Sequence, residues 1–162
     1  TFVYGTGNPE TRIVFVGEAP GEQEDKQGLP FVGAAGKLLT DLLGTIGLTR
    51  DDIFICNVIK CRPPGNRKPE EDEIRSCEPH LFEQINIIKP KLVVALGTFA
   101  AQSLLDTVQP IGKLRGRWVR WRDSELLATF HPSAGLRSSQ FRKTIEEDFQ
   151  ILKSRIDKLS PA

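Results

Sequence analysis

The sequence contains no methionine, one tyrosine, two histidines and three cysteines in 162 residues. Three cysteines are too few for a disulfide framework, and this usage is typical of a protein from the reducing cytoplasm. No apolar run approaches the roughly 18 residues that a transmembrane helix needs, so we expect no membrane partner. Of all residues, 39% are hydrophobic and 27% are charged. This composition predicts a single globular domain over residues 1–162, and the absence of an initial methionine suggests a trimmed chain.

The formal net charge of +1 conceals an uneven distribution of charge along the chain. Residues 1–56 contain four basic and eight acidic residues, whereas residues 111–143 contain eight basic and two acidic residues. A local basic segment is what phosphate contacts require, because Lys and Arg release condensed counterions when they neutralise phosphates. A basic surface without a ligand explains the same charges, and composition alone does not decide between these two interpretations.

Four short, continuous apolar runs alternate with segments of helical character. Such runs predict strands that are buried on both faces, and their alternation with helices indicates βαβ units and a mostly parallel sheet covered on both sides. The strands are expected at 12–16, 53–56, 92–96 and 126–130. The helices are expected at 34–46, 69–88, 98–105 and 139–159. Alternating residues at 117–121 add a short edge strand or hairpin.

Polar or ionisable residues follow three of the four predicted strands, in loops rich in Gly and Pro. Gly17 and Glu18 follow the first strand, Asn57 follows the second and His131 follows the fourth. Ligands of open parallel sheets bind beyond the carboxyl ends of the strands, so these residues are candidates for a site. Each also has an ordinary structural role, because Asn57 can cap a turn and His131 can lie on the surface. Residues 17–21 match neither nucleotide-binding glycine motif, which disfavours a nucleoside triphosphatase.

Four motifs, in this order, resemble one known family across residues 5–150. They are GEAPG at 17–21, GLPFVGAAGKLL at 28–39, CNVIKCRPPGNRKP at 56–69 and HPSAGLR at 131–137. The family is the uracil-DNA glycosylase superfamily, and the sequence is most similar to the iron-sulfur, thermostable-type members of family 4. The resemblance implies an α/β fold, a three-layer αβα sandwich with a central four-stranded, mostly parallel sheet. It also implies DNA repair by hydrolysis of the N-glycosidic bond of flipped-out uracil, which leaves an abasic site.

The resemblance assigns a uracil-binding role to four residues. Phe31 would stack on the extruded base, and the Asn57 amide would accept a hydrogen bond from N3–H and donate one to O4. Cytosine presents the reverse pattern at these two atoms. Gly17 would let the backbone approach the base, and Glu24 is expected near C5, where bulk excludes thymine.

The resemblance also assigns catalytic roles. His131 would donate a hydrogen bond to O2 of the departing uracilate, in either its neutral or its charged form. Ala19 stands where other members carry Asp or Asn. We therefore expect Glu18 or Asn66 to position the attacking water, unless the DNA phosphates stabilise the cationic sugar largely unaided.

The segment HPSAGLR is expected to lie against DNA at the lesion. The superfamily often has a large apolar residue four positions after the histidine, where this chain has Gly135. Leu136 or Arg137 would then fill the space left by the base. Ser133, Arg137 and Arg142 are expected to contact phosphate.

An iron-sulfur cluster is expected in the intact family member. The family holds a 4Fe-4S cluster with four cysteines, and Cys61 and Cys77 have the spacing of two of them. The other two form a C-x2-C pair upstream of the first strand, and this chain has none. Cys61 and Cys77 are therefore half of a site, while Cys56 is expected to be a small core residue. Because the first residues resemble the family just after the missing pair, we favour truncation ahead of Thr1 over natural loss of the cluster.

Two other functions are weighed against uracil excision. One is a non-turnover or covalent uracil-DNA-binding module of the same fold; its known members carry a basic, His-containing insertion, whereas residues 61–67 contain no His. The other is an electron-transfer iron-sulfur protein, which three cysteines disfavour and which leaves Phe31, Asn57 and His131 unexplained. We expect a monomeric enzyme whose partner is uracil-containing DNA.

Overall fold

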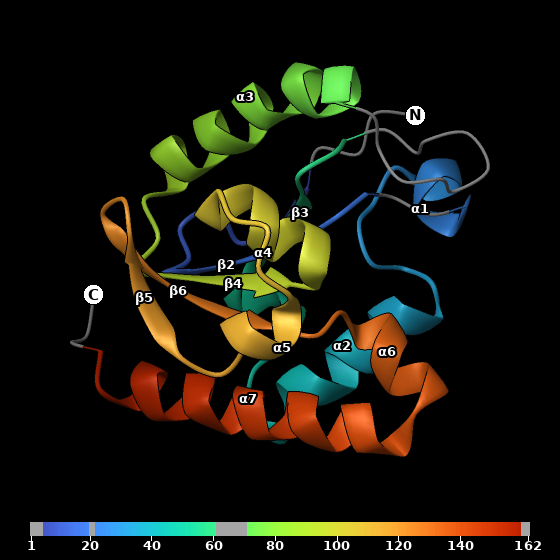
Figure 1. The fold of residues 1–162 in the computed structure, drawn as a ribbon, viewed down its shortest axis with the longest axis vertical. Helices are drawn as coiled ribbons and strands as arrows, with labels where there is room; N and C mark the ends of the chain where they lie inside the picture. Colours follow the sequence, from blue (N-terminus) through green and yellow to red (C-terminus); the bar gives the residue numbers. More distant parts are fainter. Residues whose placement is uncertain (1–4, 20–21, 61–70, 160–162) are drawn as a thin grey trace.

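The computed structural model describes residues 5–19, 22–60 and 71–159. A mixed, six-stranded sheet forms the centre of the fold, in the order β1-β3-β2-β4-β6-β5 (Figure 1). Its four inner strands are parallel: β3 (Phe54–Asn57), β2 (Ile13–Gly17), β4 (Leu92–Leu96) and β6 (Ser124–Thr129). Two antiparallel strands form the edges, β1 (Thr6–Gly7) and β5 (Trp118–Trp121). The predicted parallel core and the edge strand near 117–121 are confirmed, and β1 is an addition.

Helices cover both faces of this sheet and produce three layers (Figure 1). One face carries α2 (Ala34–Thr45), α6 (Pro132–Arg137) and α7 (Ser139–Asp157). The other face carries α3 (Glu71–Ile88), α4 (Thr98–Leu105) and α5 (Ile111–Leu114). The short helices α1 (Glu22–Gln27) and η1 (Arg50–Asp52) lie in the connections between β2, α2 and β3. The three-layer αβα sandwich is the fold that the sequence predicts.

The inner strands are apolar along their whole length because both of their faces are buried. Ile13 and Phe15 pack against α2 and α7, while Val14 and Val16 pack in the cluster that contains α3 and α4 residues. In α2 the apolar stripe consists of four buried leucines at positions 38, 39, 42 and 43. The continuous runs therefore indicate a parallel sheet enclosed on both sides.

Two segments that the sequence predicts as loops contain short helices. Residues 22–27 are helix formers without Gly or Pro, which accounts for α1. In 131–137, His131 caps the helix and Pro132 occupies its first turn, where a missing N–H costs nothing. Of the helices within the described residues, none is both long enough and apolar enough to cross a membrane.

Candidate active site

The carboxyl ends of the parallel strands bring Gly17, Asn57 and Phe31 into contact. Gly17 ends β2 and pairs in register with Asn57, which ends β3. A Cβ atom on Gly17 would lie 2.5 Å from Asn57 Oδ1 and 2.6 Å from Phe31 Cζ. Only glycine leaves room for the amide and the ring side by side. Three of the four residues with a predicted uracil-binding role therefore meet at one point.

Asn57 carries a buried acceptor without a partner. The residue is 2% exposed, and its Oδ1 accepts no hydrogen bond from the described residues. Leaving such an atom unsatisfied costs about 1–3 kcal/mol, so a buried orphan acceptor needs an explanation. Oδ1 and the Phe31 ring both border Gly17, so a planar ligand that stacks on the ring and has a hydrogen-bond donor at its edge can satisfy this acceptor.

The Phe31 ring is held in a loop with an unusual backbone. Phe31 has φ 54°, in the left-handed region that L side chains rarely adopt. The guanidinium of Arg50 donates hydrogen bonds to the carbonyl oxygens of Pro30 and Phe31, each at 2.8 Å. These contacts come from η1, on the far side of α2 in sequence. The loop that presents the ring is therefore fixed by a distant side chain.

Glu24 restrains the same loop from its other end. Its Oε2 accepts hydrogen bonds from the backbone amides of Val32, at 2.9 Å, and Gly33, at 2.8 Å. Burial lowers the pKa of Arg50, and the charge of Glu24 acts in the opposite direction. Glu24 thus positions the Phe31 loop, and its expected place near C5 of the base stays a prediction.

His131 follows β6 and caps α6. Its Nδ1 accepts a hydrogen bond from the Ser133 backbone amide at 3.1 Å and lies 2.9 Å from the Ser133 hydroxyl. An Nδ1 that accepts leaves the proton of a neutral ring on Nε2. The imidazole stacks on Phe31, with ring centroids 5.5 Å apart and an angle of 25° between the planes. His131 therefore joins the cluster of Gly17, Asn57 and Phe31.

The electrostatic environment keeps His131 neutral. Burial, followed by the positive charge of Arg137, lowers its pKa from 6.5 to about 4, while Glu24 acts in the opposite direction. The ring is therefore uncharged near neutral pH and offers one N–H donor. The sequence left the charge state open, and the local hydrogen bonds favour the neutral form.

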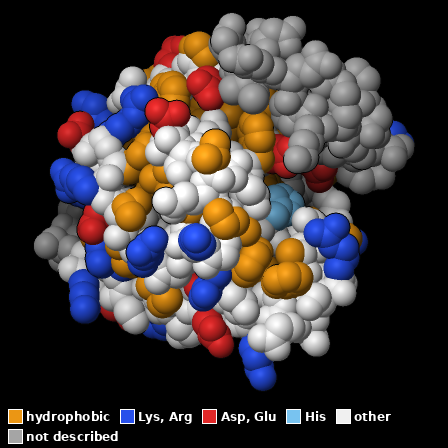
Figure 2. Space-filling model, in the orientation of Figure 1, with side chains coloured by type: hydrophobic (Ala, Val, Ile, Leu, Met, Phe, Trp, Pro, Cys, Tyr) orange, Lys and Arg blue, Asp and Glu red, His pale blue; other side chains and the backbone are white. Residues whose placement is uncertain are grey.

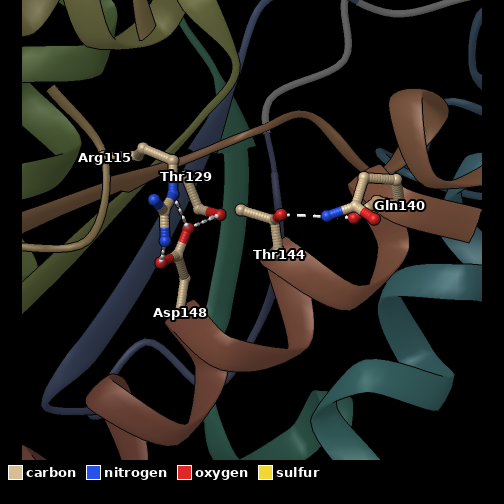
Figure 3. A network of polar contacts seen from close by, with 5 residues as sticks. All are labelled: Arg115, Thr129, Gln140, Thr144 and Asp148. Atoms are coloured by element: carbon tan, nitrogen blue, oxygen red, sulfur yellow. Dashed lines mark hydrogen bonds and ion pairs between the residues drawn. The ribbon is translucent and has the colours of Figure 1, made fainter. Parts of the chain in front are cut away.

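A partly buried ion pair anchors the end of β6, the strand that precedes His131 (Figure 3). Asp148, on α7, has no exposed surface and accepts hydrogen bonds from Arg115 Nε at 3.0 Å and Nη2 at 2.6 Å. It also accepts one at 2.6 Å from the hydroxyl of Thr129, the last residue of β6 and two residues before His131. The hydrogen bond with Asp148 raises the pKa of Arg115. A Cβ on Gly97, which follows β4, would lie 3.0 Å from His131 Cβ, so this glycine packs closely against the histidine.

The remaining predicted catalytic and metal residues are only partly described. Glu18 directly follows β2, its side chain is half-buried and its carbonyl accepts a hydrogen bond from the amide of Ile59. Asn66 and Cys61 lie outside the described residues. Cys77 is half-buried on α3. The roles of all four stay predictions.

The described residues do not by themselves fit an iron-sulfur cluster. They contain no group of three or more His, Cys, Asp or Glu side chains that could hold a metal ion. Cys56 is buried in β3, as expected for a small core residue, and Cys77 alone does not match a group with four thiolate ligands.

The predicted DNA-contacting residues lie beside His131 on α6 and α7. Leu136 is 52% exposed, and Arg137 and Arg142 are exposed as well. A Cβ on Gly135 would lie 3.0 Å from Leu38 Cδ2 and 3.4 Å from Arg142 Cα, so this position is packed and does not protrude. Lys and Arg side chains lie over α5 and next to α6 (Figure 2).

The basic segment at 111–143 is divided in space. Arg115 is bound to Asp148, and the Arg122 guanidinium stacks 4.1 Å from the centroid of the Phe82 ring. Arg120 pairs in register with Glu125, near the amino end of β6 and away from His131. Only part of the segment can therefore contact a ligand at the strand ends.

Sequence reasoning missed three residues that shape the site: Arg50, Gly36 and Asp148. A Cβ on Gly36 would lie 1.8 Å from the Phe31 carbonyl oxygen, so glycine is required there. Asp148 had a usable signal, because it interrupts the apolar stripe of α7 between the buried Ile145 and Phe149. Arg50 had no usable signal in the sequence, because no local pattern links it to a loop 19 residues earlier.

The chain is similar to known proteins along most of its length. Residues 4–153 match the model of the uracil DNA glycosylase superfamily. A type-4 uracil-DNA glycosylase of Sulfurisphaera tokodaii is 49% identical over 160 residues, which are 93% of this chain and 73% of that protein. One of Thermotoga maritima is also 49% identical, over 96% of this chain and 83% of that protein. A type-5 uracil-DNA glycosylase of Pyrobaculum aerophilum is 29% identical, over 91% of this chain and 72% of that protein.

Proposed function

This chain belongs to the uracil DNA glycosylase superfamily, and we infer that it repairs DNA by hydrolysing the N-glycosidic bond of flipped-out uracil. The observation that carries this function is the buried Oδ1 of Asn57, which has no hydrogen-bond partner among the described residues and lies near the Phe31 ring. A base inside a duplex cannot reach such an atom, whereas an extruded base can. Extrusion costs least for a mispaired base, which favours the U·G pair that deaminated cytosine produces.

Asn57 selects uracil by its Watson–Crick edge. Oδ1 accepts from N3–H of uracil, and Nδ2 donates to O4. Cytosine offers an acceptor at N3 and a donor at position 4, so both contacts become repulsive. Sites that hydrogen-bond one pattern reject the wrong one by up to about 10⁴–10⁵-fold, because their buried groups are otherwise left unpaired.

His131 stabilises the leaving base. As the bond to deoxyribose breaks, negative charge develops on the uracil, and its O2 accepts a hydrogen bond from Nε2–H of the neutral imidazole. The contact of Nδ1 with Ser133 supports this proton arrangement. Donors placed at a developing oxyanion typically lower the activation free energy by about 3–4 kcal/mol.

The sugar passes through an oxocarbenium-like state that water then attacks. Glu18 or Asn66 positions this water in our proposal, because Ala19 cannot. Exchange of Glu18 for Gln tests the carboxylate. A strong loss of excision without loss of stability supports a water-positioning role, whereas unchanged excision assigns this task to Asn66 or to the DNA phosphates.

The exposed segment after His131 contacts the DNA. Arg137, Arg142 and Ser133 bind phosphates, and the half-exposed Leu136 fills the space that the base vacates. Measured affinity should fall as the salt concentration rises, because each phosphate contact releases a counterion. Affinity that does not change with salt would contradict these contacts.

Excision from a labelled oligonucleotide that contains one uracil tests the function directly. Alkali cleaves the abasic product, and single-turnover rates report the chemical step. Asn57→Ala and His131→Ala should each lower the rate by at least about 10²-fold. His80→Ala and Asn86→Ala, which change exposed residues of α3, are the matched controls. Near-normal rates for both site variants would exclude the mechanism.

A further inference from the structure

The carbonyl oxygen of Phe31 accepts a hydrogen bond from the side chain of Arg50. A cavity of about 580 Å³ adjoins the Phe31 loop, and Phe31, Val32, Gly36, Lys37 and Arg50 are among its lining residues. The Arg50 guanidinium is part of the lining of this cavity and reaches the carbonyl oxygens of Pro30 and Phe31.

The same guanidinium connects the loop to α2. Nη1 of Arg50 lies 3.4 Å from the Gly36 carbonyl oxygen and 3.2 Å from the Thr40 hydroxyl, both in α2. Gly36 has no Cβ, which allows the Phe31 carbonyl to approach the helix closely. One planar side chain therefore connects the first turns of α2 to Pro30 and Phe31 in the loop before the helix.

Arg50 also belongs to the element that leads into β3. It begins η1 (Arg50–Asp52), and β3 starts at Phe54 and ends at Asn57. The residue thus connects the ring that faces the base to the strand that carries the base-reading amide. Stacking and edge recognition of one planar ligand need a fixed geometry between these two groups.

A backbone conformation that L residues disfavour persists only when its surroundings enforce it. Phe31, at φ 54°, is such a residue, and Arg50 and Glu24 are its restraints. We propose that Arg50 is a positioning residue for base recognition, which holds the Phe31 ring in the orientation that stacks on extruded uracil. This inference rests on the proposed function.

The test is a double-mutant cycle between Arg50→Met and Phe31→Leu. Methionine keeps an apolar stem and removes all four donated contacts, whereas Arg50→Lys keeps the charge and loses the planar fork. The readouts are kcat/KM for uracil excision and the inhibition constant of free uracil, which reports base binding without chemistry. Arg155→Met is the matched control, because Arg155 is also half-buried but contacts Glu125 and Trp118.

Arg50→Met should lower kcat/KM by about 10- to 100-fold and raise the inhibition constant of uracil by a similar factor. Arg50→Lys should lie between it and the wild type. In the double variant the two losses should not multiply, because both act on the same ring. Arg155→Met should leave the inhibition constant unchanged.

Losses that multiply in the double variant, or an unchanged inhibition constant in Arg50→Met, would overturn the proposal and assign Arg50 to general stability. If Arg50→Met does not fold, Arg50→Lys in the same cycle decides by the same criteria. A wild-type protein that releases no uracil would instead refute the proposed function, so the two failures are distinguishable.

Discussion

The two halves of the pocket are held in different ways. Gly17 and Asn57 are strand residues, paired to each other in register within the sheet. Phe31 and His131 lie outside the strands, and each depends on side chains far away in sequence. Arg50 and Glu24 hold the loop of Phe31, whereas Asp148 holds the end of the strand that precedes His131.

In the proposed mechanism, this difference separates recognition of the base edge from alignment of the two rings. The backbone ladder fixes the position of Asn57, so side-chain changes elsewhere should move its amide little. The rings are fixed by a few charge-assisted hydrogen bonds, each worth roughly 1.5–3 kcal/mol. We therefore expect substitutions in the strand half to lower excision by direct steric clash. Substitutions that affect the ring half should lower excision through the loss of contacts from distant residues.

Gly17→Ala should lower excision the most, because it places a new side-chain atom directly in the strand half. The new Cβ would lie 2.5 Å from Asn57 Oδ1 and 2.6 Å from Phe31 Cζ, so both groups must shift. We expect excision to fall by about 10³-fold, since misplacement of about 1 Å alone can cost about 10²-fold and two groups move. Single-turnover kinetics measure this loss.

Gly44→Ala is the matched control for this change. A Cβ on Gly44 meets nothing within 4 Å, and the residue lies exposed in α2. Alanine should therefore leave excision unchanged and stabilise the helix by roughly 0.5–1 kcal/mol. Normal excision in Gly17→Ala would show that the amide and the ring need not lie this close together.

Asp148→Asn should have the next largest effect, and it acts on the ring half from a distance. Removing one charge from a buried pair costs about 3–5 kcal/mol, and we expect the lower value because Arg115 is partly exposed. Urea denaturation measures this change. Thr129→Val removes one hydrogen bond and should cost less, but it should still lower excision because Thr129 precedes His131 by two residues. Full activity in both variants would refute the anchoring of His131 by Asp148.

The same difference explains what the sequence could predict. The parallel core and the convergence of Gly17, Asn57 and His131 follow from apolar runs and from polar residues at strand ends, which are local patterns. The family resemblance added Phe31. The contacts of Arg50 with Phe31 and of Asp148 with Thr129 join residues 19 apart in sequence. No local pattern predicts such pairs, although an acidic residue on the apolar face of a helix indicates a buried partner.

The helices α1 and α6 were missed for a related reason. Both are six residues long, so they contain too few residues to show a helical period. In α6 the capping by His131 was the available signal, and the Gly and Pro content of the segment outweighed it. Short helices of this kind depend on their caps and neighbours more than on propensity.

The titration of His131 tests the burial of the ring half. Its pKa is about 4 in the folded protein and 6.5 in the unfolded chain, so only the unfolded chain gains a proton between these values. Falling pH therefore favours unfolding, by about 2 kcal/mol at pH 5 relative to pH 8. The stability difference between wild type and His131→Ala should change by this amount. A ring that titrates near 6.5 by NMR would contradict the burial of the imidazole in the folded protein.

Arg142→Ala should give the smallest effect, because it changes one phosphate contact beside the ring half. The slope of log affinity against log salt should become shallower by about 1, with a loss of affinity that hardly depends on DNA sequence. Arg122→Ala is its control, since the Arg122 guanidinium stacks on Phe82 and lies next to Trp121, which pairs with the first residue of β6. Equal salt slopes for the two variants would mean that the basic segment acts as a diffuse charge. A change confined to Arg142→Ala would place the DNA over the same end of the sheet as the two rings.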